Sequence, residues 1–273
     1  MVAADLLFAA MLVLLPPSEG KSAAPEGAPP VDLAELVHPE LTPQREKLLK
    51  KLDGLTKISE ARALAALGLA KSQAAELGKN VDLLSKPAAK AADIYSGVLY
   101  QYLDLHSLKA ASRKRAAERL LVQSALWGVV RLEDRIPAYR LGIGAKLPRM
   151  KGLAAWWRPA LTAALPDDEL VVDMRSGGYA AAWKPAHGTL LSVRVFVEEN
   201  GEREVVTHMA KATRGDVARI LVDAKSTSDD PNGIAEIVGN AGLRVELVAP
   251  SKPEAAWSLD VILDTRVGRL TKT

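Results

Sequence analysis

The sequence contains no cysteine among its 273 residues. This absence excludes disulfide bonds, thiolate metal sites, iron–sulfur clusters and a cysteine nucleophile, and it fits the reducing cytoplasm, where we expect the protein. Histidine is scarce too: the four present are far apart, with no carboxylate at ligand spacing, so we expect no metal site. A P-loop and a dinucleotide-binding fingerprint are missing, and we therefore expect no cofactor.

The sequence also lacks an apolar run long enough to cross a membrane, which takes about 20 residues. The candidate from Leu6 to Leu15 has no basic residue before it, and Pro16-Pro17 follows where a signal peptide has small cleavage-site residues. We therefore interpret residues 11–15 as a buried strand and residues 1–10 as an N-terminal extension, and we expect no association with a membrane.

Charges of the two signs nearly cancel. Lysine and arginine number 36 against 33 acids, which leaves a formal charge of +3 and a pI near 9.0. Such a balance permits a polyanionic partner without demanding one. Hydrophobic residues make up 48% of the chain, which is ordinary for a folded globular protein.

The pattern of apolar residues predicts an α+β fold. Residues 31–127 have the composition of helices, with Thr42-Pro43 and Ser59 as helix starts. Glu199-Asn200-Gly201 predicts a hairpin between two strands. We predict one compact domain over residues 11–264, with a helical N-terminal half, a mixed sheet in the C-terminal half and a tail at 265–273. The later elements are expected as strands at 170–174, 189–198, 204–209, 243–248 and 257–263 and as helices at 214–225 and from Asp230.

A loop rich in proline, glycine and serine follows the first predicted strand, from Pro16 to Pro30. Ser18 and Lys21 have the S-x-x-K spacing of a serine–lysine nucleophile, which requires a turn of helix, but the prolines and glycine around them disfavour a helix. We interpret Lys21 instead as an anion-binding group at the carboxyl end of a strand. A solvated loop lysine fits the sequence equally well.

The segment from Leu64 to Leu77 resembles a helix-hairpin-helix element, in which a glycine turn aims backbone N–H groups at a DNA phosphate. Gly68 would form the turn, although the second glycine of the usual pattern is absent. Lys71, Ser72 and Lys79 would supply side-chain contacts. The alternative is an ordinary pair of short helices.

The segment Ser112-Arg113-Lys114-Arg115 places three cations in what we predict to be the first turn of a helix. The helix macrodipole disfavours positive charge there, so a bound anion is one explanation. A solvated helix end neutralised by Asp104 and Glu118 is the simpler one.

Two later segments are rich in cations. One spans residues 131–149, and the other holds Lys211, Arg214 and Arg219 where a strand is predicted to give way to a helix. If the two segments face each other, they line an electropositive cleft in which arginines grip phosphates.

Aromatic residues flank the first of these segments. Trp127 or Tyr139 would stack on a base in such a cleft. In the alternative interpretation, Arg131 pairs with Asp134 and the remaining cations are surface charges.

Several segments together resemble the YaaA peroxide-stress family. The matching motifs run in family order and are LLPPSEGK (14–21), DIYSGV (93–98), WGVVR (127–131), IPAYRL (136–141), WW (156–157) and VVDMRS (171–176), with Tyr179 and the residues around Lys211 and Arg214. The resemblance implies a single-domain α+β fold with a basic cleft, a helix-hairpin-helix-like DNA-binding element and a role in limiting damage during hydrogen peroxide stress, linked to intracellular iron.

The resemblance also implies which residues line the cleft. The predicted DNA-binding set comprises the matching positions Lys21, Arg131, Arg140, Ser176, Tyr179, Lys211 and Arg214, together with Gly68, Lys71, Ser72 and Lys79 of the hairpin and Arg219. The first hypothesis is a protein that recognises duplex or damaged DNA through backbone charge and shape, with an affinity that falls steeply with salt. Glutamate at Lys71 and Lys79 would then weaken binding more than glutamate at Lys50 and Lys51.

A second hypothesis is an enzyme that acts on a nucleotide or nucleic-acid base in the same cleft. Ser176, Tyr179, Lys211 and Lys21 would be its polar groups, and a lysine whose pKa is depressed by neighbouring arginines would act as a base or an imine-forming nucleophile. The catalytic residues stay unknown in this hypothesis. A third, structural role with a protein partner has no feature of the sequence to support it.

Overall fold

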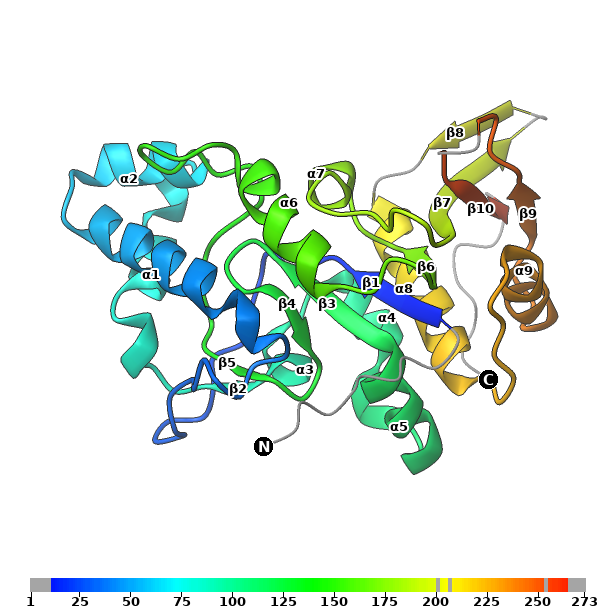
Figure 1. The fold of residues 1–273 in the computed structure, drawn as a ribbon, viewed down its shortest axis with the longest axis horizontal. Coiled ribbons are helices and arrows are strands. Elements are labelled where there is room, and N and C mark those ends of the chain that lie inside the picture. Colours follow the sequence, from blue (N-terminus) through cyan, green and yellow to red (C-terminus); the bar gives the residue numbers. More distant parts are fainter. Residues whose placement is uncertain (1–10, 200–201, 206–207, 253–254, 265–273) are drawn as a thin grey trace.

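The computed structural model describes residues 11–199, 202–205, 208–252 and 255–264. The predicted extension at 1–10, the tail at 265–273 and the hairpin turn at Asn200-Gly201 lie outside the described residues. The described chain forms a mixed eight-stranded sheet surrounded by helices (Figure 1). The predicted α+β class is therefore confirmed.

The sheet is built around β1 (Met11–Leu15), as predicted for this segment. Its strand order is β4-β3-β1-β6-β7-β10-β9, with β8 paired to β7. β1 runs parallel to both β3 and β6, and β7 runs parallel to both β6 and β10. All five side chains of β1 are buried, because a central parallel strand is covered on both faces.

The other strands of this sheet are β3 (Leu120–Ser124), β4 (Gly128–Arg131), β6 (Leu170–Asp173), β7 (Leu190–Glu199), β8 (Glu202–Val205), β9 (Val245–Val248) and β10 (Trp257–Asp264). A separate two-stranded sheet joins β2 (Ala89–Lys90) to β5 (Arg135–Ile136). β7 and β8 pair in antiparallel register, as the predicted hairpin requires.

The helices are α1 (Thr42–Thr56), α2 (Glu60–Leu67), α3 (Ala91–Ile94), α4 (Val98–Leu103), α5 (Ala110–Arg119), α6 (Leu153–Ala164), α7 (Gly177–Ala180), α8 (His208–Asp223) and α9 (Pro231–Asn240). Short 3-10 segments cover Pro39–Leu41, Lys71–Asn80, Leu83–Ser85 and Leu105–Ser107. Ser59 precedes α2 as its N-cap, and the Asp230 carboxylate caps α9 by accepting from Asn232 N–H at 2.7 Å. These helix starts were predicted from the sequence.

Arg45 anchors α1 to the sheet. Figure 1 shows α1 and α2 together beyond the β4 end of the sheet. The buried guanidinium of Arg45 donates to the Trp127 carbonyl at 3.0 Å and to the Val37 carbonyl at 2.6 Å. Burial lowers the pKa of Arg45 to about 10. A buried cation held by backbone carbonyls fixes the orientation of the helix, because leaving it without partners would cost several kcal/mol.

The predicted helical half contains a strand that sequence periodicity misassigned. β3 occupies residues 120–124, within the segment predicted as helical, and its five side chains are buried. A short apolar run gives the same pattern in a buried strand and a buried helix. The sheet therefore draws β1, β3 and β4 from the first half of the chain and is not confined to the C-terminal half.

α8 begins earlier than predicted. The strand expected at 204–209 ends at Val205, and α8 starts at His208 instead of Arg214. Lys211 and Arg214 therefore lie inside a helix, not at a junction between strand and helix. The segment has no proline and no glycine before Gly215, so tertiary packing decides which structure it adopts.

The basic segment at 113–115 lies beyond the first turn of α5, which begins at Ala110. Arg115 donates to the Val222 carbonyl at 2.7 Å and Arg119 donates to the Leu221 carbonyl at 2.8 Å. These carbonyls belong to the last turn of α8, where cations are favoured by the helix dipole. Arg115 of this segment and the nearby Arg119 thus cap a neighbouring helix, and Lys114 pairs with Glu118 at 3.8 Å. A bound anion is not needed to explain the segment.

Candidate functional site

The main cavity of the described structure opens where β1 and β6 end. Its volume is about 680 Å³. The loop that follows β1 forms one wall and the turn that follows β6 forms another, so the cavity lies at the carboxyl ends of adjacent parallel strands, a common place for ligands. The lining residues are Pro16 to Lys21, Leu67, Gly68, Gly97 to Tyr100, Arg140 to Ala145, Ser176, Tyr179, Lys211 and Arg214.

Lys21 lies at the base of this cavity. Its ammonium donates to the Ser18 carbonyl at 2.7 Å and lies over the Tyr139 ring, 4.2 Å from the centroid. Burial and the nearby charges of Arg140 and Lys79 lower the pKa of Lys21 from 10.5 to about 7. The neutral amine of Lys21 is therefore well populated near neutral pH.

Three hydroxyl groups form a buried chain beneath Lys21. The Tyr139 hydroxyl is 3.0 Å from that of Tyr95 and 2.7 Å from that of Ser124. Burial raises the pKa of both tyrosines well above the usual value, so both stay protonated. This chain fixes the Tyr139 ring that supports the lysine.

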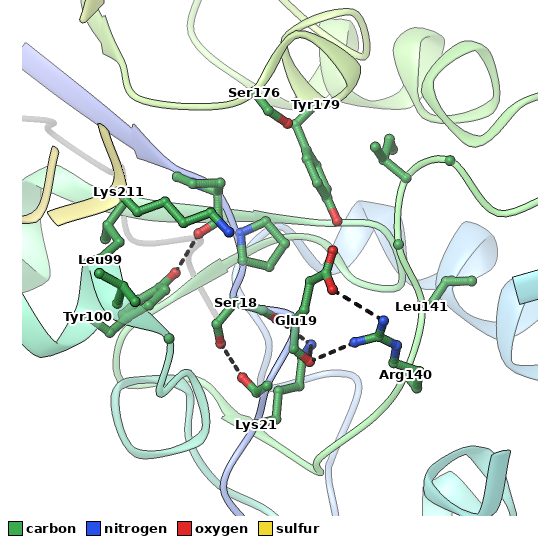
Figure 2. Close-up of a pocket in the computed structure, with 18 of the residues that line it drawn as sticks. Ser18, Glu19, Lys21, Leu99, Tyr100, Arg140, Leu141, Ser176, Tyr179 and Lys211 are labelled. Atoms are coloured by element: carbon green, nitrogen blue, oxygen red, sulfur yellow. Dashed lines mark hydrogen bonds and ion pairs between the residues drawn. The ribbon is translucent and has the colours of Figure 1, made fainter. Parts of the chain in front are cut away.

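Arg140 and Glu19 meet across the cavity. The Arg140 guanidinium donates to the Glu19 carboxylate at 3.2 Å and to the Glu19 carbonyl at 3.3 Å. Asn80 holds the Arg140 backbone by accepting its N–H at 2.8 Å and donating to its carbonyl at 2.7 Å. Figure 2 shows the Glu19 side chain between Tyr179 and Arg140. Glu19 is the single acid among the described lining residues.

Ser176 and Tyr179 form the opposite wall, and they extend toward the cavity in Figure 2. A buried ion pair just before them sets this turn: the Arg175 guanidinium donates to the Asp173 carboxylate at 2.7 Å, and it also donates to Gln123. The Tyr179 hydroxyl accepts the Ile143 backbone N–H, and burial raises its pKa.

α8 brings two further cations to the cavity. Lys211 is exposed at the rim, and the half-buried Arg214 donates to the Val193 carbonyl at 3.1 Å. Close packing of α8 against α4 positions both, because Gly215 leaves no room for a side chain: an added Cβ would lie 2.7 Å from the Tyr102 Cβ. The cavity therefore has four cationic side chains, Lys21, Arg140, Lys211 and Arg214.

The structure brings together part of the predicted DNA-binding set. The lining residues include Lys21, Gly68, Arg140, Ser176, Tyr179, Lys211 and Arg214. Lys71 and Ser72 are exposed outside the lining, and Lys79 pairs with Glu76 at 2.8 Å. The charge of Lys79 nevertheless reaches the cavity, because it helps to lower the pKa of Lys21.

Two predicted arginines lie elsewhere. Arg131 is half-buried at the end of β4, and its backbone N–H donates to the Asp134 carboxylate at 3.0 Å. Arg219 donates to the Asp104 carbonyl at 2.8 Å and to the Asp223 carboxylate at 2.6 Å. Arg219 thus connects α8 to the end of α4, and its guanidinium makes structural contacts outside the main cavity.

The structure contradicts the prediction that Trp127 or Tyr139 stacks on a base. Trp127 and Tyr139 are both 0% exposed, so neither ring face is open to a base. Tyr139 supports Lys21 from below, and Trp127 packs edge-on against the Tyr139 ring with centroids 6.0 Å apart. Both rings belong to the core because large aromatic side chains contribute most when fully buried.

The predicted hairpin has a glycine turn, but the structure does not confirm a helix-hairpin-helix. Gly68 ends α2 in the left-handed conformation, with φ of 67°, which glycine adopts without strain. The next segment, Lys71–Asn80, is 3-10 helix with a kink at Gln73. Gly68 faces the main cavity, so the turn contributes to the site without a second α-helix.

The serine–lysine spacing does not form a nucleophile pair. The Ser18 hydroxyl donates to the Gly20 carbonyl at 2.5 Å, and the Lys21 ammonium contacts the carbonyl of Ser18 instead of its hydroxyl. The interpretation of Lys21 as a group presented at a strand end matches its position. Among the described residues, no cluster of three or more histidine and acidic side chains is placed to hold a metal ion, and no helix is long and apolar enough to span a membrane.

Sequence reasoning missed two contributors to the cavity. Glu19 was not singled out, although it lies in the first matching motif, and only its contact with Arg140 shows its importance. The segment Gly142-Ile143-Gly144 was assigned no role from the sequence, yet it lines the cavity, and the Ile143 backbone N–H donates to Tyr179. Its position two residues after Arg140 was the available signal.

Comparisons with known proteins place these features in a family. A family described as "Peroxide stress protein YaaA" matches residues 11–245. A UPF0246 protein of Streptomyces coelicolor is 45% identical over 257 residues, which cover 93% of this chain and 98% of that protein. A UPF0246 protein of Corynebacterium efficiens is 39% identical over 242 residues, which cover 87% and 95% of the two chains.

Proposed function

Because the chain belongs to the peroxide stress protein YaaA family, we propose that it acts in peroxide stress by binding DNA at the main cavity through backbone charge and shape. One observation carries this proposal: Lys21, Arg140, Lys211 and Arg214 come from distant parts of the chain and line one cavity, whose described lining includes a single acid, Glu19. Converging cations of this kind bind phosphate groups.

The size of the cavity favours one nucleotide over a whole duplex. Its volume of about 680 Å³ lies in the usual range for small-ligand sites. A nucleotide turned out of the helix would fill it, and the adjoining phosphates would reach the cations at the rim. Damaged bases leave the stack at lower cost than intact ones, so this geometry favours damaged DNA.

Glu19 occupies the position that an anion would take in this proposal. Its carboxylate is 82% exposed while the Arg140 side chain it contacts is only 16% exposed. A solvated carboxylate is easily displaced, because an ion pair with one exposed partner contributes little. A phosphate group would replace Glu19 on the Arg140 guanidinium.

Fluorescence anisotropy with a labelled duplex that carries one abasic nucleotide tests this proposal. The variant R140Q/K211Q loses two lining cations, and the control K114Q/R244Q loses two exposed cations that are ion-paired outside the cavity. We expect the first pair to weaken binding and to reduce the slope of log K against log salt by about 2. Equal affinity and equal slope in the two variants would reject the cavity as the binding site.

The lowered pKa of Lys21 favours a second, catalytic role for the same cavity. With a pKa of about 7, much of the amine is neutral at physiological pH and can attack a carbonyl carbon. The aldehyde of a ring-opened abasic deoxyribose is such a carbon. The nitrogen adds to it to form a carbinolamine, which loses water to give an iminium linking Lys21 to the DNA.

Borohydride tests this step, because it reduces the iminium to a stable amine. We expect a covalent protein–DNA adduct with abasic DNA, absent in K21M and retained in K211M at DNA concentrations that saturate binding. Trapping should increase as the pH rises through the pKa that Lys21 has in the DNA complex, which lies above its value of about 7 in the free protein, because the neutral amine is the nucleophile. An adduct that persists in K21M, or no adduct with the unaltered protein, would exclude imine chemistry at Lys21.

A further inference from the structure

A second, smaller pocket lies between α1 and the segment leading into α6. Its volume is about 270 Å³, and its lining residues are Lys47, Lys50, Lys51, Arg149, Met150 and Trp156. The three lysines follow i, i+3, i+4 spacing on α1, which places them on one face of the helix. We refer to Lys47, Lys50, Lys51 and Arg149 as the second basic cluster.

The second basic cluster has no counter-ion among the described residues. None of its four cations forms an ion pair with a described carboxylate, and Lys51 is satisfied only by the Pro148 carbonyl at 3.1 Å. Some other surface cations are paired, such as Lys57 with Asp53 at 2.7 Å and Lys90 with Glu133 at 2.5 Å. The four positive charges repel one another. A bound anion would reduce this repulsion, so the cluster favours anion binding.

The backbone and an aromatic ring shape the second pocket. Arg149 has φ of 56°, a left-handed conformation that a residue with a Cβ adopts at a cost of about 1 kcal/mol or more. In this conformation Arg149 lines the same pocket as the lysines of α1. Trp156 is half-buried, with the Lys47 ammonium 5.8 Å from its ring centroid. The pocket therefore offers an apolar wall beside four cations, the combination that binds a sugar–phosphate chain.

One loop links the two pockets. Residues 140–145 line the main cavity and residues 149–150 line the second pocket. Three residues separate Ala145 from Arg149, and the four Cα–Cα steps between them span at most about 14 Å. Lys146 is exposed between them. A DNA strand that leaves the main cavity along this loop reaches the second basic cluster within a few nucleotides.

We propose that the second basic cluster binds phosphate groups of the DNA strand whose nucleotide occupies the main cavity. The proposal rests on the proposed function, because it takes the same ligand. It reverses the ordering expected from the sequence, in which Lys50 and Lys51 were bystanders and Lys71 and Lys79 were contacts. Lys79 is instead paired with Glu76, whereas Lys50 and Lys51 belong to an unpaired cluster.

Anisotropy titrations with single-stranded oligonucleotides of two lengths test the proposal. The variant is K47Q/K50Q/R149Q, and the control is K90Q/K114Q/R244Q, which removes the same charge from three ion-paired cations. For an oligonucleotide of about 20 residues we expect the variant to lose about tenfold or more in affinity at low salt and about 2 in the salt slope. For a dinucleotide, whose single phosphodiester stays with the nucleotide in the main cavity, variant and control should bind equally.

The outcomes separate this inference from the proposed function. Equal binding of the long oligonucleotide by variant and control would overturn the second cluster alone. Failure of the unaltered protein to bind either oligonucleotide would overturn both. Inorganic tripolyphosphate distinguishes the source of phosphate, and its binding to the cluster is detected by a fluorescence change that W156F removes. If tripolyphosphate binds there while K47Q/K50Q/R149Q leaves the affinity for the long oligonucleotide unchanged, the cluster binds small phosphate compounds and the DNA assignment is wrong.

Discussion

The ammonium of Lys21 lies 4.2 Å from the centroid of the Tyr139 ring, inside a cavity that holds three other cations. The ring face partly compensates the charge, but burial and neighbouring cations outweigh it and lower the pKa of Lys21 to about 7. The protonation of Lys21 therefore changes the charge of the cavity by one and determines whether its amine has a free lone pair.

DNA affinity should depend on pH through Lys21. A bound phosphate favours the protonated amine and raises its pKa. DNA binding therefore takes up a proton at every pH at which Lys21 is neutral in the unbound protein. We expect affinity to rise by up to about tenfold per pH unit as the pH falls from about 9 to about 7 and to level off below. Anisotropy titrations across this range measure the effect. The K21M variant should show a flat profile, and a profile unchanged in K21M would assign the proton to another group.

Removing the charge of Lys21 should stabilise the fold. Between the folded pKa of about 7 and the unfolded value of 10.5, the unfolded chain binds a proton that the native chain has released, so stability rises with pH. At neutral pH we expect K21M to be more stable by about 1–2 kcal/mol, with the gain shrinking toward pH 10. Urea denaturation at several pH values measures this. A destabilised K21M would show that the contacts with Tyr139 and Ser18 outweigh desolvation.

Breaking the buried Asp173–Arg175 pair should destabilise the turn that carries Ser176 and Tyr179. The two side chains are 4% and 0% exposed, so D173N leaves a buried guanidinium without its counter-charge. We expect a loss of about 3–5 kcal/mol in the free energy of unfolding. Urea denaturation measures this loss. As a control, E118Q removes the exposed Lys114–Glu118 pair and should lower the free energy of unfolding by less than about 1 kcal/mol. Similar losses in the two variants would contradict the structural role.

Two glycine-to-alanine substitutions in helices should have opposite effects. In G215A the new Cβ meets the backbone of Leu99 and lies 2.7 Å from the Tyr102 Cβ, whereas in G54A nothing lies within 4 Å. We expect G215A to cost about 1–3 kcal/mol and G54A to gain up to about 1 kcal/mol through helix propensity. Thermal unfolding measures both. A neutral G215A would mean that α4 and α8 are not tightly packed at this point.

G215A should also weaken DNA binding, because α8 carries Lys211 and Arg214. Displacing the helix moves both cations relative to Lys21, while G54A leaves them in place. Anisotropy titrations under conditions where both variants are folded measure this effect. Unchanged affinity in a folded G215A would show that the cations of α8 contribute little to binding.

Local patterns in the sequence predicted much of the fold. The strand at 11–15 was evident from five apolar residues ended by two prolines, and the start of α9 was evident from Asp230 followed by proline. These features are determined by neighbours in the chain. β3 and the start of α8 were misassigned because short apolar or mixed segments adopt either structure according to what packs on them.

The sequence by itself determined the types of residue available to the site: cations and hydroxyls in the motifs shared with the family, and no cysteine. Only the tertiary structure decided which of them meet. It placed Arg140 and Lys211 in one cavity and used the Arg219 side chain for contacts between helices. It buried Trp127 and Tyr139. It left Lys50 and Lys51 without ion pairs in a pocket with Trp156. The reason is physical: a side chain's charge, pKa and exposure depend on neighbours distant in sequence, and strand order and helix packing set those neighbours.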